Sequence, residues 1–268
     1  MRAFLIVMSV GVAFAMPSPV HDYLTAVGPG ISLAVTDLAT DTTYSHDDNA
    51  VVNPASVIKV PILLAYLHQI QSGVLSGDEM VLLRREDIQP GAGTLRYRSP
   101  GESIRLDELA ELMIRHSDNT ATLLLIRFLG LATINGYMQS WGLSDSILKT
   151  GRLLDDVPEN TMSVRDIQRL LVRLSRYEIL TPVLTQRALQ LLGSQKYRWG
   201  LPKRLPGFVR VSNKTGTLTG FRHDVGVIVS DSAAYVVSIF TTGLSKSKAS
   251  EVIATLSDLV YTDLISKK

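Results

Sequence analysis

The chain has 268 residues, with 27 Lys and Arg against 25 Asp and Glu, for a formal net charge of +2. A charge so close to zero excludes a nucleic-acid binder that works through bulk positive charge. Apolar residues make up 46% of the chain and charged residues 19%, which indicates a globular protein with a buried core. The sequence has no cysteine, and this excludes disulfides, thiol nucleophiles and thiolate-bound metals.

The first fifteen residues have the pattern of a signal peptide. Arg2 precedes an apolar stretch over residues 3–15, which ends in Ala13-Phe14-Ala15, a cleavage pattern of small residues around a larger one. The alternative is a buried N-terminal helix. No later apolar run approaches the ~20 residues of a membrane span, and no cysteine could carry a lipid anchor. We therefore expect residues 16–268 to form a periplasmic or secreted monomer without a membrane anchor.

The expected elements begin with strands and continue with a long block of helices. Residues 31–37 and 42–46 alternate like a β-hairpin. Asn53-Pro54-Ala55-Ser56 opens a helix that continues to Gly73, with Pro61 in its second turn. Turn-forming residues predict a loop over 84–103, and the periodicity breaks again over 144–160. Helical periodicity predicts further helices at 106–116, 119–129, 131–141, 163–175 and 182–193.

Two of these helices have a predicted start signal. Ser163 and Asp166 have the spacing of a capping box, and Thr181 precedes Pro182 as an N-cap followed by proline at the first helical position.

The period of the apolar pattern changes from 3.6 to 2 after Pro206. Three antiparallel strands are expected within 208–216, 224–231 and 233–243, and an amphipathic helix over 245–265. Strands from both ends of a chain can share one sheet only if the helices between them form an inserted lobe. The sequence thus predicts an α+β fold, a three-layer α/β/α sandwich, with an α/β lobe at about 16–55 and 206–268 and a helical lobe at about 56–205.

Ser56 and Lys59 lie one turn apart at the start of a predicted helix. A partly desolvated lysine has a lowered pKa and can take a serine proton, while the N–H groups of a helix N-terminus can stabilise an oxyanion. This pair therefore suits acyl transfer. The same Ser-x-x-Lys pattern recurs at Ser245 and Lys248, in a polar turn where we expect a solvated pair without function.

Two more short motifs are candidates for chemistry. Ser117-Asp118-Asn119 lies between two predicted helices, where such a triplet also serves as a cap. Lys214-Thr215-Gly216-Thr217 lies on a predicted strand, where lysine also protects a sheet edge. The tripeptide Lys-Thr-Gly occurs a second time over 149–151. We favour Lys214 because its strand pairs with two others, whereas Lys149 lies in an irregular segment.

These three motifs, in this order, form the signature of class A β-lactamases and penicillin-binding proteins. The flanking stretches match as well, and the chain resembles the class A β-lactamase-like serine hydrolases along almost all of its mature length. The resemblance implies the β-lactamase/transpeptidase-like fold and a small-molecule substrate, either a β-lactam or a D-Ala-D-Ala peptide. The matching stretches are NPASVIKVPILLAY, RHSDNTATLLLIRFLG and NKTGTLTGFRHDVGVIVSD.

The resemblance also implies a role for each motif residue. Ser56 would be the acylated nucleophile and Lys59 its proton acceptor. Ser117 would pass a proton to the leaving nitrogen, and Lys214 would bias Ser117 and attract the substrate carboxylate. Backbone N–H groups of Ser56 and Thr217 would form the oxyanion hole. Arg222 or His223 would help to hold the carboxylate, and Arg222 is the better bidentate partner. The expected substrate-binding residues are Asn119, Thr215, Gly216, Thr217 and Arg222.

One departure from the family concerns deacylation. Class A β-lactamases carry a Glu-x-x-Leu-Asn motif before the position of Met162, and the segment GRLLDDVPENTMS lacks it. Asp155, Asp156 and Glu159 are candidates for the base that activates water, although each can equally be an exposed loop charge. Without a base, deacylation loses general-base assistance of about 10²–10⁴-fold.

Three functions remain open on the sequence. The first is hydrolysis of β-lactams, the second a D,D-peptidase acting on peptidoglycan stem peptides, and the third a penicillin-binding module that stays acylated. The five histidines, including His116 at a predicted helix end, show no metal-ligand spacing, and no glycine-rich phosphate loop follows a strand. We therefore expect neither a metal nor a cofactor.

Overall fold

A five-stranded antiparallel sheet forms the centre of the protein, with strand order β2-β1-β9-β8-β7. A computed structural model describes residues 15–152 and 160–266. Val35, near the start of the chain, lies opposite Val237 near its end. Strands from both ends thus share one sheet, as predicted. The strands are β1 (Ile31–Asp37), β2 (Thr43–His46), β7 (Arg210–Leu218), β8 (Phe221–Val229) and β9 (Ala234–Thr242).

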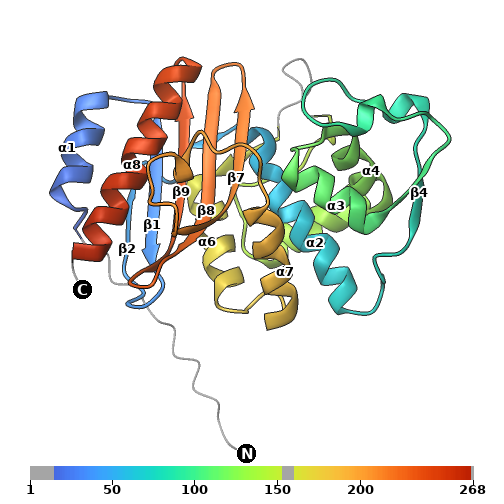
Figure 1. Ribbon diagram of the computed structural model, residues 1–268, viewed down its shortest axis with the longest axis horizontal. Coiled ribbons are helices and arrows are strands. Elements are labelled where there is room, and N and C mark those ends of the chain that lie inside the picture. The colour runs from blue at the N-terminus through green and yellow to red at the C-terminus, as the bar shows by residue number, and fades with distance from the viewer. Residues whose placement is uncertain (1–14, 153–159, 267–268) are drawn as a thin grey trace, which may run out of the picture.

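Helices cover both faces of this sheet (Figure 1). One face packs against α1 (Ser18–Val27) and α8 (Lys246–Ser266), and the other faces α6 (Val164–Ser175) and α7 (Pro182–Gly193). Side chains alternate between the faces of a strand. In β9, Tyr235 and Val237 accordingly lie in the core under α1 and α8, while Val236 and Phe240 lie in the core shared with the helical block. The three-layer α+β architecture is confirmed.

The helical block is built around α2 (Lys59–Gln71). The first nine residues of this helix, Lys59 to Leu67, are all buried. A helix that is apolar on all sides requires partners all round it. Neighbouring helices supply them, and α2 contacts each of them as well as α7. They are α3 (Leu106–Arg115), α4 (Asn119–Leu129) and α5 (Leu131–Ser140).

The start of α2 differs from the prediction. Residues Ala55–Ile58 form a short 3₁₀ turn, and the α-helix begins only at Lys59. Pro61 therefore lies in the first turn of α2, and not in the second. The first four N–H groups of a helix have no intrahelical partner, so proline there removes no hydrogen bond.

Several small elements were not predicted. The helix α1 is absent from the sequence-based expectation, and the segment 84–103 is not wholly irregular. It contains two short 3₁₀ turns, Arg85–Asp87 and Leu95–Tyr97, and its last residue begins β5. A further 3₁₀ turn covers Leu201–Lys203. Two small sheets pair β3 (Val51–Val52) with β6 (Met162–Ser163), and β4 (Met80–Leu82) with β5 (Ser103–Arg105).

The two predicted start signals are each met in part. Ser163 Oγ caps α6 by accepting from Asp166 N at 3.2 Å. The Asp166 carboxylate accepts from Asp145 N and Ser146 Oγ instead of reaching back to complete a capping box. Pro182 is the first residue of α7, as predicted, while the Thr181 side chain makes no capping hydrogen bond to the described residues.

The predicted signal peptide lies almost wholly outside the described residues, which begin at Ala15. No single helix within 15–152 and 160–266 has the length and hydropathy of a membrane span. The bent pair formed by α4 and α5, with 85° between the two helices, passes that test by length and composition only.

Candidate active site

Ser56 lies in the 3₁₀ turn that precedes α2. Its neighbour Ala55 has a φ of 47°, a conformation that residues with a Cβ rarely adopt. Asn53 holds the turn from two sides. Its side-chain Oδ1 accepts from Ala55 N at 2.9 Å, and its backbone oxygen lies 2.9 Å from His223 Nε2. The half-buried Ser56 is thus presented on a fixed, strained turn between the sheet and the helical block.

Lys59, one turn after Ser56, is completely buried. Its Nζ donates to Ser117 O at 2.6 Å, Ser117 Oγ at 3.1 Å and Asn119 Oδ1 at 2.9 Å. Burial lowers the pKa of Lys59 well below its ordinary value, and the nearby charge of Lys214 lowers it further, against a smaller opposing effect of Asp118. The contacts found for Nζ within the described residues do not include Ser56 Oγ. Catalytic hydrogen bonds are often long without substrate, so this does not remove the pair as a candidate.

Lys214, on β7, reaches the same serine from the other side. Its Nζ donates to Ser117 Oγ at 3.0 Å and to Thr215 O at 2.8 Å. Burial lowers the pKa of Lys214 to about 7, although the charge of Asp224 opposes the shift. Ser117 Oγ therefore lies between two buried amines. When it accepts from both, its own proton can be donated to a third group.

The turn between α3 and α4 places Ser117 in this position. Ser117 has a φ of 53°, which only a well-supported residue with a Cβ maintains. The support comes from Asp118, whose Oδ1 caps α4 by accepting from Ala121 N at 2.9 Å. Its Oδ2 accepts from the backbone N–H groups of Thr94 and Leu95 at 2.6 and 2.7 Å. Asp118 thus serves as the expected cap and also fixes the loop that crosses the site.

Asn119 connects the same loop to Lys59. Its Oδ1 accepts from Lys59, and its Nδ2 donates to Pro90 O at 3.0 Å. One of the two amide protons is therefore used within the protein, and the other can donate to a ligand.

Gly216 allows β7 to approach the turn that carries Ser56. A Cβ at this position would lie 2.8 Å from Pro54 O, 3.2 Å from Ala55 Cβ and 3.3 Å from Ser56 N. These contacts are with backbone and a short side chain, which cannot rotate away. Glycine at 216 is thus required by the close approach of strand and turn, and Gly216 acts through its backbone.

Arg222 and His223 lie on β8 and face opposite sides of the sheet. His223 is buried and stacked on Phe240, and Thr241 N donates to its Nδ1 at 3.2 Å. Burial lowers the pKa of His223 to about 4, so the ring is neutral. Both of its nitrogens are occupied, and this leaves Arg222 as the candidate for binding an anion.

The guanidinium of Arg222 is preorganised by an aromatic ring. Its central carbon lies 3.6 Å from the centroid of the Trp199 ring, a cation–π contact. Its Nε is buried without a hydrogen-bond partner among the described residues. Arg222 lies opposite Thr217 in the β7–β8 register. Thr217 itself is half-buried and Thr215 is buried.

Asp224 is an important buried residue that sequence reasoning missed. Its Oδ1 accepts from Asn213 Nδ2 at 2.8 Å and its Oδ2 from Leu201 N at 2.8 Å. Burial raises the pKa of Asp224 to about 7. The carboxylate is close enough to favour the charged form of Lys214. The sequence signal for Asp224 was an acid directly before the apolar run VGVIV.

The second copies of the motifs lie outside this cluster. Ser245 and Lys248 are both exposed: Ser245 directly precedes α8, Lys248 lies in its first turn, and Ser245 Oγ accepts from Lys248 N at 3.3 Å. Lys149 is exposed as well.

The candidate deacylation bases Asp155, Asp156 and Glu159 lie outside the described residues. Asn160, which follows them, accepts from the N–H groups of Lys149 and Thr150 at 2.7 and 3.0 Å. Within the described ranges, no group of three or more His, Asp or Glu side chains has the arrangement of a metal site.

Comparison with known proteins identifies the family. A model of the β-lactamase enzyme family matches residues 20–264. The chain belongs to this family. The β-lactamase family assignment makes it a serine hydrolase of the class that acts on cyclic amide bonds.

The proteins similar to this chain carry different functional descriptions. The β-lactamase regulatory protein BlaB of Streptomyces cacaoi is 27% identical, over 78% of this chain and 83% of its own. A β-lactamase from Sphaerobacter thermophilus shares 26% identity with a TM-score of 0.87, over 92% of this chain and 97% of its own. A Leu-to-Glu mutant of PBP-A, solved as an acyl-enzyme with penicillin G, shares 29% identity with a TM-score of 0.85, over 91% of this chain and 95% of its own.

Proposed function

We propose that this protein opens β-lactam amides through an acyl-enzyme at Ser56 and releases the product slowly. The observation that carries the proposal is the position of Ser117 Oγ, 3.1 Å from Lys59 Nζ and 3.0 Å from Lys214 Nζ. Two amines with lowered pKa around one hydroxyl make a short path for a proton.

The acylation step follows from this path. Neutral Lys59 takes the proton of Ser56 as its oxygen bonds to the amide carbon. The N–H groups of Ser56 and Thr217 stabilise the resulting oxyanion. Ser117 then gives its proton to the nitrogen as the C–N bond breaks, and Lys59, which contacts Ser117 directly, replaces that proton. The net result is the transfer of one proton from Ser56 to the leaving nitrogen by a relay through Lys59 and Ser117, and Lys59 is neutral again.

The substrate carboxylate binds at the other end of the site. Charged Lys214, the hydroxyls of Thr215 and Thr217, and the guanidinium of Arg222 form its binding set. Asn119 donates its remaining amide proton to the carbonyl of the substrate side chain. Support comes from the buried position of Lys214 and the ring that holds Arg222, since a preorganised cation binds a carboxylate with less loss of entropy.

A second candidate function is a D,D-peptidase, which performs the same first half-reaction on a peptide. The absence of Glu-x-x-Leu-Asn from residues 151–163 favours it, because hydrolysis of a β-lactam acyl-enzyme then lacks its usual base. The similar structure of a PBP-A mutant was solved as an acyl-enzyme with penicillin G, and this supports an acyl-enzyme that persists. If hydrolysis of the acyl-enzyme fails altogether for lack of this base, the protein is a penicillin-binding module that stays acylated. We also propose that the protein is exported, which the signal-peptide pattern of residues 1–15 supports. We propose in addition that it is a monomer.

Intact-protein mass spectrometry tests the proposal. Residues 16–268 are mixed with penicillin, and the mass is followed over time beside a Ser56→Ala variant. We expect a mass gain equal to the whole penicillin that decays slowly, and no gain in the variant. No gain in the unchanged protein would overturn the proposal. Decay within seconds would mean that Asp155, Asp156 or Glu159 supplies an efficient base.

A peptide ending in D-Ala-D-Ala separates the two candidate functions. Release of D-Ala without turnover of penicillin would assign the protein as a peptidase. Turnover of penicillin without release of D-Ala would assign it as a β-lactamase.

A further inference from the structure

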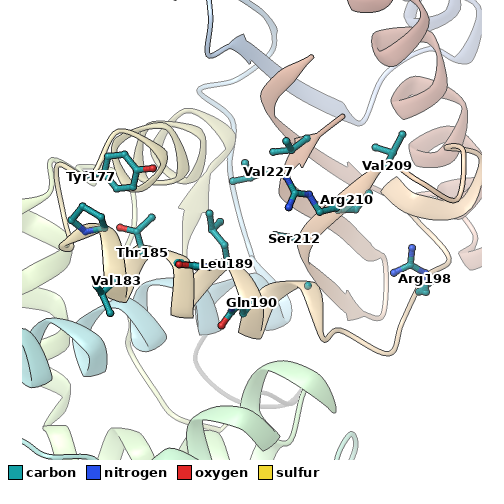
Figure 2. Close-up of a pocket in the computed structure, with 15 residues that line it drawn as sticks. Tyr177, Val183, Thr185, Leu189, Gln190, Arg198, Val209, Arg210, Ser212 and Val227 are labelled. Carbon is teal, nitrogen blue, oxygen red and sulfur yellow. The ribbon is translucent and has the colours of Figure 1, made fainter. Parts of the chain in front are cut away.

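A second cleft lies away from the candidate active site, between α7 and the first half of β7 (Figure 2). Its volume is about 670 Å³, within the roughly 300–1,000 Å³ of small-molecule sites. Figure 2 shows Leu189 and Gln190 of α7 on one side and Arg210 and Val227 of the strands on the other. The motif residues Ser56, Lys59, Ser117 and Lys214 do not line it.

The cleft carries positive charge without compensation. Two of its fifteen lining residues, Arg198 and Arg210, are basic, and none is acidic. The ion pairs found within the described residues use other arginines; Glu178, next to the lining residue Tyr177, pairs with Arg173. Many exposed arginines of this protein have a carboxylate partner, such as Arg204 with Glu251. The two arginines of the cleft are therefore available for an anion from outside.

The remaining walls are largely apolar. Val227, Val229 and Leu189 form part of the lining between the sheet and α7. At the cleft's edge, Tyr177 and Val183 expose 58% and 75% of their surface to water. Contiguous exposed apolar surface around a hollow is typical of a place that binds something.

We propose that this cleft binds a small amphipathic carboxylate, a molecule with an apolar body and one anionic end. The carboxylate would pair with Arg210 and Arg198, since guanidinium matches the two oxygens of a carboxylate. The apolar body would lie along Val227, Val229 and Leu189 toward Tyr177. Four neutral polar side chains also line the cleft and can provide further hydrogen bonds: Thr185, Gln186, Gln190 and Ser212.

Titration calorimetry with decanoate and decanol tests the proposal. The two probes have the same chain length, so their difference isolates the anionic end. We expect decanoate to bind with 1:1 stoichiometry and decanol at least about tenfold more weakly, because it cannot pair with an arginine. The titration is repeated on protein acylated by penicillin, in which the Ser56 site is occupied. Binding of decanoate that disappears on acylation would place it at the active site and overturn the proposal.

Substitutions in the cleft test whether decanoate binds there. Arg198→Gln combined with Arg210→Gln should weaken the binding of decanoate by about tenfold or more and leave the binding of decanol unchanged. The matched control removes two charges from α8, as Lys246→Gln combined with Lys248→Gln, because neither lysine lines the cleft. Leu189→Trp, which fills the cleft, should abolish binding of both probes. Absence of decanoate binding, or an equal loss in the two double variants, would overturn the proposal.

Discussion

The protein contains each of two short motifs twice, and the copies differ in their surroundings. Ser56 lies on a strained turn between sheet and helices, and Lys59 at the start of α2 is completely buried, whereas Ser245 and Lys248 are exposed at the start of α8. Lys214 is likewise completely buried, and Lys149 is exposed. The two buried lysines have a lowered pKa and share a contact with Ser117. Burial, rather than the residue pattern, therefore lowers the pKa of these two amines.

The largest effect expected from this comparison concerns the two serines. Ser56→Ala should abolish covalent labelling by penicillin, because no other hydroxyl occupies the turn before α2. Ser245→Ala should leave labelling unchanged. Gel-based detection of a fluorescent penicillin adduct measures both. Labelling that survives in Ser56→Ala would show that the nucleophile is another residue.

Substitutions of the buried lysines and of the exposed Lys149 should also differ by a large factor in their effect on the acylation rate. Lys59→Gln and Lys214→Gln should each slow acylation by about 10²–10⁴-fold, the usual range for a group that moves or biases a proton. Lys149→Gln should change the rate by less than twofold. Stopped-flow measurement of the second-order acylation rate separates these outcomes. Equal effects of Lys149→Gln and Lys214→Gln would mean that the wrong Lys-Thr-Gly copy was chosen.

The glycines of the two Lys-Thr-Gly copies allow a more sensitive comparison. Gly216→Ala should slow acylation by about 5–150-fold, since the new methyl would lie 2.8 Å from Pro54 O and displace the strand or the turn. In Gly151→Ala the methyl would meet Leu123 Cδ1 at 2.8 Å and Ile126 Cδ1 at 3.1 Å. These are ends of side chains that can shift, so acylation should be almost unchanged. Thermal unfolding of both variants provides the control, because a rate loss in Gly216→Ala with a preserved Tm excludes simple misfolding.

The smallest effect concerns pH and compares the two buried lysines. Lys214 is charged below its pKa of about 7 and neutral above it. Its attraction for a substrate carboxylate is therefore fully present at pH 6 and is lost as the pH rises through about 7. Lys59 must be neutral to accept a proton, so its contribution increases with pH. We expect a bell-shaped profile of the acylation rate, with an alkaline limb that falls by at most tenfold per pH unit.

The variant Lys214→Gln tests whether the alkaline limb of the profile is due to Lys214. It should lose that limb and keep the acid one, although its overall rate is lower. An alkaline limb that persists in this variant would show that another group titrates there.

Much of the fold could be predicted because the apolar patterns are regular. The predicted helices 119–129 and 182–193 coincide with α4 and α7, and strand 31–37 with β1. The predictions were incomplete where tertiary contacts decide the conformation. Ala55, with its positive φ, donates to Asn53, and Ser117, with its positive φ, precedes Asp118, whose side chain caps α4; neither contact has a local sequence pattern that predicts the φ.

The candidate site could be predicted as a set of residues but not as a geometry. The three motifs named the residues that meet at Ser117, yet the sequence did not indicate that His223 holds the nucleophile turn or that Asp224 is buried near Lys214. Both depend on which face of β8 each side chain occupies. The register of Thr217 opposite Arg222 sets that alternation.

The pairing of β1 with β9 also has a consequence for how the protein folds. Residues such as Ile31 and Thr241, which lie opposite each other, come from the two ends of the chain. Contacts between distant parts of a chain slow folding, because a long loop must close before they form. The strand that carries Lys214 also belongs to the last quarter of the sequence, so Ser56 has no complete set of partners until nearly the whole chain is available. Catalytic competence should therefore appear late and all at once, making acylation by penicillin a sensitive reporter of complete folding.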